Sequence, residues 1–112
     1  EVDDITIVEL VRLIDTWLME YTDPIDEIRE AVNNAIKNGY ILLAVLNNRI
    51  VGVAVIINTG FEVFISSYHL AYIATDKKVK GRGVATQLLQ KAIDLTERNL
   101  SLRRSFNWRL YL

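Results

Sequence analysis

The stretch that decides the fold is Val79-Lys80-Gly81-Arg82-Gly83-Val84-Ala85, where two hydrophobic patterns meet. An apolar run from Ala71 to Thr75 precedes it, and an amphipathic helix pattern follows it. Glycine at 81 and 83 can adopt backbone angles closed to other residues and lets a ligand oxygen approach the main chain. The first amides of the following helix are unpaired and lie at the positive end of its dipole. The stretch therefore predicts a strand, a glycine turn and a helix start, an arrangement suited to cradling phosphate.

Two amphipathic helices are predicted before residue 40. Apolar residues at three- and four-residue steps mark the first helix and are Ile7, Leu10, Val11, Ile14, Trp17, Leu18 and Tyr21. Asp23-Pro24 predicts an N-cap followed by proline at the first position of a second helix. The apolar stripe of this second helix consists of Ile25, Ile28, Val32, Ala35 and Ile36. Asn38-Gly39 predicts a left-handed end to it.

The pattern changes to that of strands from Tyr40 onward. Dense Ile, Val and Leu on either side of Asn47-Asn48-Arg49 predict two interior strands joined by a tight turn. A second break at Asn58-Thr59-Gly60 precedes a long β-prone stretch from Phe61 to Thr75. Regular alternation in this stretch predicts one face with His69, Ala71, Ile73 and Thr75, and the other with Tyr68, Leu70, Tyr72 and Ala74.

A third helix is predicted from about Val84 to Arg98. Its inward side is expected to consist of Val84, Leu88, Leu89, Ala92, Ile93 and Leu95. The segment from Leu100 to Leu112 is expected to supply one further short strand and a helical turn. Residues 1–112 thus form a single predicted domain of the α/β (α+β) class, in the order α-α-β-β-β-α-β.

Length and composition exclude several classes of protein. A chain of 112 residues forms one domain that buries roughly two-thirds of its unfolded surface. Its 51% of hydrophobic residues argues against disorder. The chain has no cysteine, which excludes disulfides and zinc–thiolate sites, and we expect no metal site. The lack of cysteine is compatible with a reducing interior, and we expect a cytoplasmic protein. The longest apolar runs, Ile41 to Leu46 and Ile50 to Ile57, are too short to cross a bilayer, so we expect no membrane partner.

Charge is unevenly spread along the chain. Residues 1–97 carry nine basic and fourteen acidic side chains, a net of −5, whereas residues 98–112 carry four arginines and no acid. This basic end is either a solvated arginine face or a tail that binds phosphate or a partner. The acidic body and the lack of a basic-aromatic stripe argue against nucleic-acid binding.

Glycine pairs are weak evidence by themselves, because tight strand-to-helix turns also use glycine for steric reasons. Two familiar phosphate sites are excluded. The chain lacks the six-residue glycine fingerprint of dinucleotide folds, and it lacks the GK[ST] ending of a P-loop.

The element order together with KGRGVATQLL, residues 80–89, resembles the GNAT family of N-acetyltransferases over roughly Ile7 to Leu102. The family signature is Arg or Gln, two residues, Gly, one residue, then Gly or Ala. Lys80, Gly83 and Ala85 stand at its three defined positions here. Lysine keeps the positive charge but lacks the planar fork that arginine offers to a phosphate. The resemblance implies a mixed, mostly antiparallel sheet flanked by helices.

The resemblance also implies how acetyl-CoA would bind. The amides from about Arg82 to Thr86 would hold its pyrophosphate, with charge added by Lys80 and Arg82. This cofactor-binding stretch is Lys80, Gly81, Arg82, Gly83, Val84, Ala85 and Thr86. The backbone of Ile73 and Thr75 would pair with the pantetheine arm as an added strand would. The implied activity is acetyl transfer to a primary amine of a small molecule or peptide.

Catalysis needs an oxyanion donor, a base for the attacking ammonium and often an acid for the thiolate. The stretch from Phe64 to Thr75 contains no carboxylate, which leaves His69 as a candidate base, although a packed or surface histidine is the alternative. Glu62 is a second candidate, against a solvated loop acid. Tyr111, in Arg109-Leu110-Tyr111-Leu112, matches a tyrosine that serves relatives as the acid. Tyr68 and Tyr72 are interpreted as packing residues with hydroxyls at the sheet edge.

Relatives normally continue past this point through a helix and two strands that close the acceptor side. We expect this closing segment to be lacking here, which would leave a sheet edge exposed. Either a second copy covers this edge in a homodimer, or the chain is a truncated or frame-altered product. Two alternative functions stay open on the sequence. One is a catalytically impaired CoA-binding sensor or interaction module, and the other is an unrelated α/β protein whose glycines only form a turn.

Overall fold

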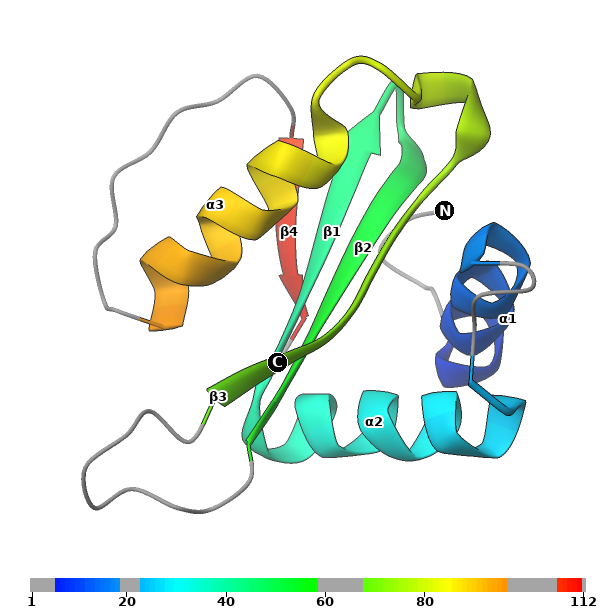
Figure 1. Cartoon of the computed structure of the whole chain (residues 1–112), viewed down its shortest axis with the longest axis vertical. Coiled ribbons are helices and arrows are strands. Elements are labelled where there is room, and N and C mark those ends of the chain that lie inside the picture. Colours follow the sequence, from blue (N-terminus) through cyan, green and yellow to red (C-terminus); the bar gives the residue numbers. More distant parts are fainter. Residues whose placement is uncertain (1–5, 19–22, 59–67, 97–106, 112) are drawn as a thin grey trace.

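A four-stranded antiparallel sheet separates two sets of helices (Figure 1). The computed structural model describes residues 6–18, 23–58, 68–96 and 107–111. In chain order the elements are α1 (Ile7–Leu18), α2 (Ile25–Asn38), β1 (Tyr40–Leu46), β2 (Arg49–Asn58), β3 (Tyr68–Thr75), the short 3₁₀ helix η3 (Lys77–Val79), α3 (Val84–Thr96) and β4 (Asn107–Tyr111). The strand order is β3-β2-β1-β4. The predicted order of elements and the predicted fold class are both confirmed.

Alternate residues of the interior strands enter two separate cores, because successive side chains of a strand point to opposite faces. In β1, Ile41 and Leu43 pack against α1 and α2, whereas Leu42 and Ala44 pack against α3. The core between the sheet and helices α1 and α2 is called the first core. The two helices contribute to it Leu10, Val11, Ile14, Ile28, Val32 and Ala35. Nearly continuous burial along β1 and β2 confirms that they are interior strands.

The predicted hairpin between β1 and β2 turns at Asn47 and Asn48. Both residues have positive φ, 52° and 61°. A two-residue turn that matches the twist of its strands requires such angles, and asparagine adopts them more readily than most residues.

The start of α2 differs from the prediction by one residue. Pro24 occupies the N-cap position, where no side-chain capping bond is made, and the helix begins at Ile25. The Pro24 carbonyl accepts hydrogen bonds from the amides of Glu27 at 2.9 Å and Ile28 at 3.2 Å. The Asp23 carboxylate accepts a hydrogen bond from Tyr72 on β3 instead. A tertiary partner thus takes the side chain that the local sequence assigned to the helix start.

Gly39 ends α2, but the predicted left-handed conformation is wrong. Its φ of −126° and ψ of −138° lie outside that region, and its amide donates to the Ala35 carbonyl oxygen at 2.9 Å. A Cβ at this position would overlap the carbonyl oxygen of Ile56 on β2. Glycine is therefore required by the close approach of the α2–β1 junction to β2.

Helix α3 faces the sheet along a narrower stripe than predicted. Val84, Leu88 and Ala92 are buried, as expected, but Leu89 is 43% exposed and Ile93 is 39% exposed. Leu95 is partly buried and packs against the same core, as predicted. The predicted burial of Leu89 and Ile93 is wrong. No helix in the described part of the chain is long and apolar enough to span a membrane.

Strand β4 confirms the predicted last strand and pairs with the outer edge of β1 (Figure 1). Its partners run from Ile41, opposite Tyr111, to Val45, opposite Asn107. Strand β3 forms the other edge of the sheet and pairs only with β2 among the described strands. Its outer side therefore presents backbone N–H and C=O groups without a strand partner.

Candidate functional site

The glycine turn between η3 and α3 is held at both ends by buried valines. Val79 is 5% exposed and Val84 is 2% exposed, and both pack in the core beneath α3. Residues 80–83 between them are exposed. Gly52 on β2 lets the start of α3 approach the sheet, since a Cβ there would lie 2.9 Å from Val84 Cγ1. The turn is thus an exposed loop on a fixed frame, the usual setting of a binding loop.

Gly81 and Gly83 combine left-handed backbone angles with open surroundings. Their φ values are 87° and 78°. A Cβ built on either residue would meet no atom of the described residues within 4 Å, chain neighbours aside. The backbone angle accounts for glycine at both positions, and no neighbour fills the space beside them. A ligand can therefore reach the main chain at this turn.

Several amides at the turn donate no hydrogen bond within the described structure, namely those of Gly81, Gly83, Val84, Ala85 and Thr86. The bond that opens the helix runs from the Gln87 amide to the Gly83 carbonyl oxygen at 3.0 Å. The Arg82 amide, predicted to face phosphate, already donates to the Val79 carbonyl oxygen at 3.1 Å. The unpaired amides lie at the positive end of the α3 dipole, which favours an anion.

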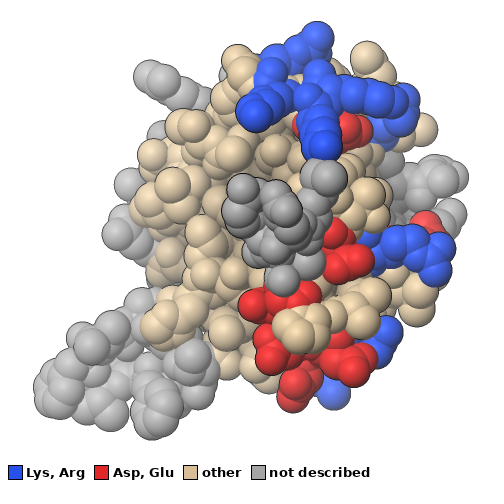
Figure 2. All heavy atoms as spheres, turned by 45° about the vertical axis from the view of Figure 1, so that its right-hand side comes forward, with Lys and Arg blue, Asp and Glu red and all other residues tan. Residues whose placement is uncertain are grey.

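Basic side chains surround these amides. Exposed cations on or beside the turn are Arg49, Lys77, Lys78, Lys80 and Arg82. Figure 2 shows basic side chains gathered at this end of the molecule and acidic side chains gathered further down the same face. Asp76 is the one acid between residues 76 and 83. The local field at the turn is therefore positive, although the whole chain has a net charge of −1.

The open edge of β3 leads directly into the turn. Beyond the last strand residue, the Asp76 amide donates to the Val51 carbonyl oxygen at 2.9 Å, so the backbone of Asp76 faces β2. Hydrogen-bonded and outward-facing positions alternate along an antiparallel strand. Ala74 and Tyr72 therefore face β2 as well, and the N–H and C=O groups of Ile73 and Thr75 point outward. These are the two residues whose backbone was predicted to pair with a ligand.

An open strand edge that ends at unpaired, positively surrounded amides is the geometry expected of a GNAT donor site. A statistical model of the acetyltransferase (GNAT) family matches residues 10–111. The chain belongs to this family. Neither a curated protein nor a solved structure matches the chain significantly. The family assignment confirms the predicted resemblance and supports an acyltransferase activity in general terms.

A β-bulge interrupts β3 of this GNAT protein and changes the predicted faces. Val55 pairs with Tyr72 and Ile56 pairs with Leu70, which leaves Ala71 as the extra residue. Ala71 and Tyr72 both pack on the side of α1 and α2, whereas Tyr68 packs on the side of α3 together with Ile73. The prediction of unbroken alternation is therefore wrong across the bulge.

His69 lies on the other side of the bulge from the glycine turn. It is exposed and pairs with Ile57, which packs toward α1 and α2. Six residues separate it from Thr75, or about 20 Å of strand. His69 thus shares its face with Tyr72 and not, as predicted, with Ile73 and Thr75.

Of the other two predicted catalytic residues, the structure describes Tyr111 only. Glu62 lies outside the described residues. Tyr111 belongs to β4, where its backbone pairs with Ile41 of β1, so β1 and β2 separate it from β3. Among the described residues, the structure brings together the predicted cofactor-binding groups, whereas His69 and Tyr111 lie on strands that β1 and β2 separate.

One contact at the site was not predicted. Tyr72 Oη donates a hydrogen bond to Asp23 Oδ2 at 2.6 Å. Burial, this hydrogen bond and the negative charges of Asp23 and Glu27 raise the pKa of Tyr72 from 10.0 to about 12. Sequence reasoning missed the pair because 49 residues separate its members and neither belongs to a motif.

Proposed function

We propose that the chain is a cytoplasmic N-acetyltransferase that moves an acetyl group from acetyl-CoA to a primary amine of a small molecule or peptide. The observation that carries the proposal is the set of amides at Gly83–Thr86 that donate no hydrogen bond within the described structure, at the end of the β3 edge that no described strand covers. Family membership supports the reaction class, and this geometry supports the donor.

The pyrophosphate of acetyl-CoA fits the glycine turn in charge and in hydrogen bonding. The amides supply donors, the α3 dipole adds partial positive charge, and Lys80 and Arg82 add full charges. Positive φ alone would explain two glycines in any tight turn. The unpaired amides and the vacant volume beside them favour a ligand over a purely steric role.

The pantetheine arm fits the outer edge of β3. It carries amide groups, and the outward N–H and C=O groups of Ile73 and Thr75 can pair with them as a neighbouring strand would. Such pairing places the thioester beyond Ile73, toward the bulge at Ala71. The acetyl carbon would therefore react beside residues 71 and 72, where an oxyanion could accept a hydrogen bond from an outward-facing amide of the strand, such as that of Ile73.

In the proposed reaction, an amine nitrogen attacks the thioester carbonyl and the thiolate leaves. His69, Glu62 and Tyr111 remain our sequence-based candidates for acid–base roles. His69 is the one among them that lies on β3. His69→Gln, which removes the base and keeps a polar side chain, tests its role.

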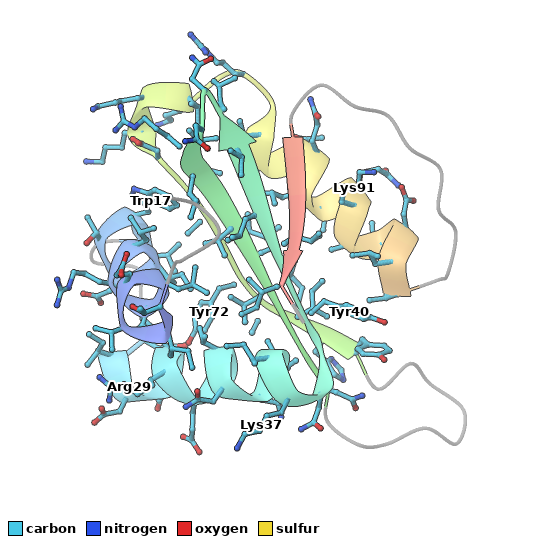
Figure 3. All side chains as sticks on the ribbon, turned by 180° about the vertical axis from the view of Figure 1, so that it is seen from behind. Trp17, Arg29, Lys37, Tyr40, Tyr72 and Lys91 are labelled. Carbon is cyan, nitrogen blue, oxygen red and sulfur yellow. The ribbon has the colours of Figure 1, made fainter. Side chains whose placement is uncertain are left out.

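The donor site is tested by titration calorimetry with acetyl-CoA, CoA and a nucleotide control. Lys80→Glu and Arg82→Glu should each weaken acetyl-CoA binding about tenfold or more, a change worth about 1.4 kcal/mol. Lys37→Glu is the matched control, because Lys37 is an exposed lysine on α2 at the other end of the molecule (Figure 3). Absence of acetyl-CoA binding to the native chain, or an equal loss in the control, would contradict the proposal.

A second candidate function is a CoA-binding sensor or interaction module without catalysis. One observation favours this alternative: β3, Tyr68–Thr75, contains no carboxylate that could act as a base. Saturable acetyl-CoA binding without transfer to any amine in a broad panel would establish this alternative. Acetylated product, detected by mass spectrometry, would exclude it.

A further inference from the structure

Tyr72 places a hydroxyl group where the sheet edge meets the α1–α2 junction. Figure 3 shows it reaching from the sheet toward α1 and α2, with Tyr40 on the opposite side of the sheet. The Tyr72 ring packs against the first core, and its hydroxyl lies 2.6 Å from Asp23 Oδ2. Both the ring and the hydroxyl are therefore fixed in position, while the hydrogen bond itself is exposed to solvent.

This hydroxyl lies beside the expected reaction centre. Ile73 and Thr75 turn their backbone groups outward for the acyl arm, and the bulge at Ala71 follows next along the edge. A thioester lying in the plane of the sheet is attacked from above or below that plane. The face beneath α3 leads to the helix that carries the phosphate turn, whereas the other face carries Tyr72 and Asp23. The acceptor amine therefore has a polar approach from the Tyr72 side.

The direction of the hydrogen bond, from Tyr72 as donor to Asp23 as acceptor, determines what else Tyr72 can bind. A tyrosine hydroxyl has one proton, and here it points to Asp23. The oxygen keeps its lone pairs for an outside donor. Its natural partner is an N–H group, and Asp23 behind it offers a carboxylate as the final proton acceptor.

We propose that the Tyr72 hydroxyl binds the acceptor ammonium and relays one of its protons to Asp23. The inference rests on the proposed acetyl transfer and assigns its acceptor side. It supplies the carboxylate that the sequence of β3 lacks, because Asp23 comes from the α1–α2 connection. Tyr72 is then a catalytic residue, and Asp23 acts through it.

The proposed step balances as follows. One ammonium proton moves to the Tyr72 oxygen while the Tyr72 proton moves to Asp23 Oδ2, which leaves a neutral amine and a protonated carboxyl group. The amine lone pair forms the C–N bond to the acetyl carbon, and the C–S electron pair leaves with sulfur. The nitrogen then gives a second proton to the thiolate, and Asp23 returns its proton to water. The products are the acetamide, CoA and one free proton.

The test compares Tyr72→Phe and Asp23→Asn with matched controls. Tyr40→Phe removes a hydroxyl from the opposite face of the sheet, and Asp26→Asn neutralises a neighbouring carboxylate that pairs with Arg29. Each of the two test variants should lose about 10²-fold or more in kcat/KM for the amine, the usual scale of acid–base catalysis. Acetyl-CoA binding, measured by calorimetry, should stay unchanged in all four variants.

Asp23→Asn separates a relay from mere positioning. Asparagine keeps an oxygen that can accept the Tyr72 hydrogen bond, but it is not a base at neutral pH. A relay predicts lost turnover of alkyl amines and a much smaller loss with a hydrazide acceptor, which is neutral at the assay pH. Full activity of Asp23→Asn with alkyl amines, or an equal loss with both acceptors, would overturn the proposal.

Two further outcomes are decisive. Full activity of Tyr72→Phe together with inactive His69→Gln would overturn the relay and leave the proposed function standing. A native chain that binds acetyl-CoA but acetylates no amine would overturn both. Should Tyr72→Phe fail to fold, the Asp23→Asn comparison still decides the matter.

Discussion

Tyr72, on the edge strand β3, makes a tertiary contact that its neighbours in the sequence do not predict. Its hydroxyl joins two segments that are 49 residues apart, at 2.6 Å. The same carboxylate was expected to cap α2, and the hydroxyl outcompetes that local use. A carboxylate bond to a backbone amide at the helix start would be charge-assisted as well, so bond strength alone does not explain the outcome. The difference is one of position, because Pro24 stands between Asp23 and the first residue of α2, whereas the Tyr72 hydroxyl lies 2.6 Å from Asp23 Oδ2.

At high pH we expect Tyr72 to ionise later than a tyrosine in the unfolded chain. Its pKa is raised to about 12 by burial and by Asp23, so folding favours the protonated form. The stabilisation it provides is complete below pH 10 and is lost as the pH rises from about 10 through 12. Absorbance of tyrosinate at 295 nm should show a phase near pH 12 that disappears in Tyr72→Phe. An alkaline unfolding curve identical in native and Tyr72→Phe proteins would contradict this expectation.

At the scale of elements, two glycines that look alike in the sequence have different physical causes. Gly39 is required by packing, because a Cβ would overlap the Ile56 carbonyl oxygen. Gly83 is required by its φ of 78°, and a Cβ there would meet no atom of the described residues within 4 Å, chain neighbours aside.

We therefore expect Gly39→Ala to destabilise the fold much more than Gly83→Ala. Alanine at 83 adds only the backbone strain of a left-handed residue, about 1–2 kcal/mol. Alanine at 39 forces the α2–β1 junction away from β2 and disturbs the backbone of two elements. Urea unfolding followed by circular dichroism gives both free energies. An equal or smaller loss at Gly39 would refute the packing explanation.

The elements themselves were largely predictable from local pattern. Apolar spacing located α1 and α2, and Asn47-Asn48 located the hairpin, because these signals lie within a few residues. The bulge at Ala71 left no such signal, since an extra residue in a strand needs no glycine or proline. The exposure of Leu89 and Ile93 also could not be predicted. Apolar spacing shows which residues share a side of α3, but it does not show how much of that side the sheet covers.

The donor side of the candidate site could be predicted from the sequence, whereas the acceptor side could not. The donor side depends on a contiguous glycine motif, so Lys80 to Thr86 could be predicted from the sequence. The acceptor side joins Asp23 to Tyr72 through the tertiary fold. The apolar periodicity of the chain does not predict the contact between Asp23 and Tyr72.

Across the whole molecule, the free edge of β3 has two possible partners. The sequence-based expectation of a homodimer would cover the edge with a second copy, whereas the proposed donor would cover it with pantetheine. The outward backbone groups of Ile73 and Thr75 cannot bind both at once.

We therefore expect acetyl-CoA to shift any dimer formed through β3 toward monomer. Multi-angle light scattering at one protein concentration, with and without acetyl-CoA, measures the shift. A nucleotide without the pantetheine arm serves as the control. A dimer that is stable at saturating acetyl-CoA must use another surface, and it would disprove competition for this edge.

The pairing of β4 with β1 has a consequence for how the molecule assembles. Val45 meets Asn107, 62 positions later, whereas β1, β2 and β3 follow one another along the chain. Contacts between distant segments form slowly, because a long loop must close first. Docking of β4 is thus expected to be a late folding event, and hydrogen exchange should find β4 among the first segments to open. The opposite border of the sheet, where acetyl-CoA is proposed to bind, would then stay intact during such openings.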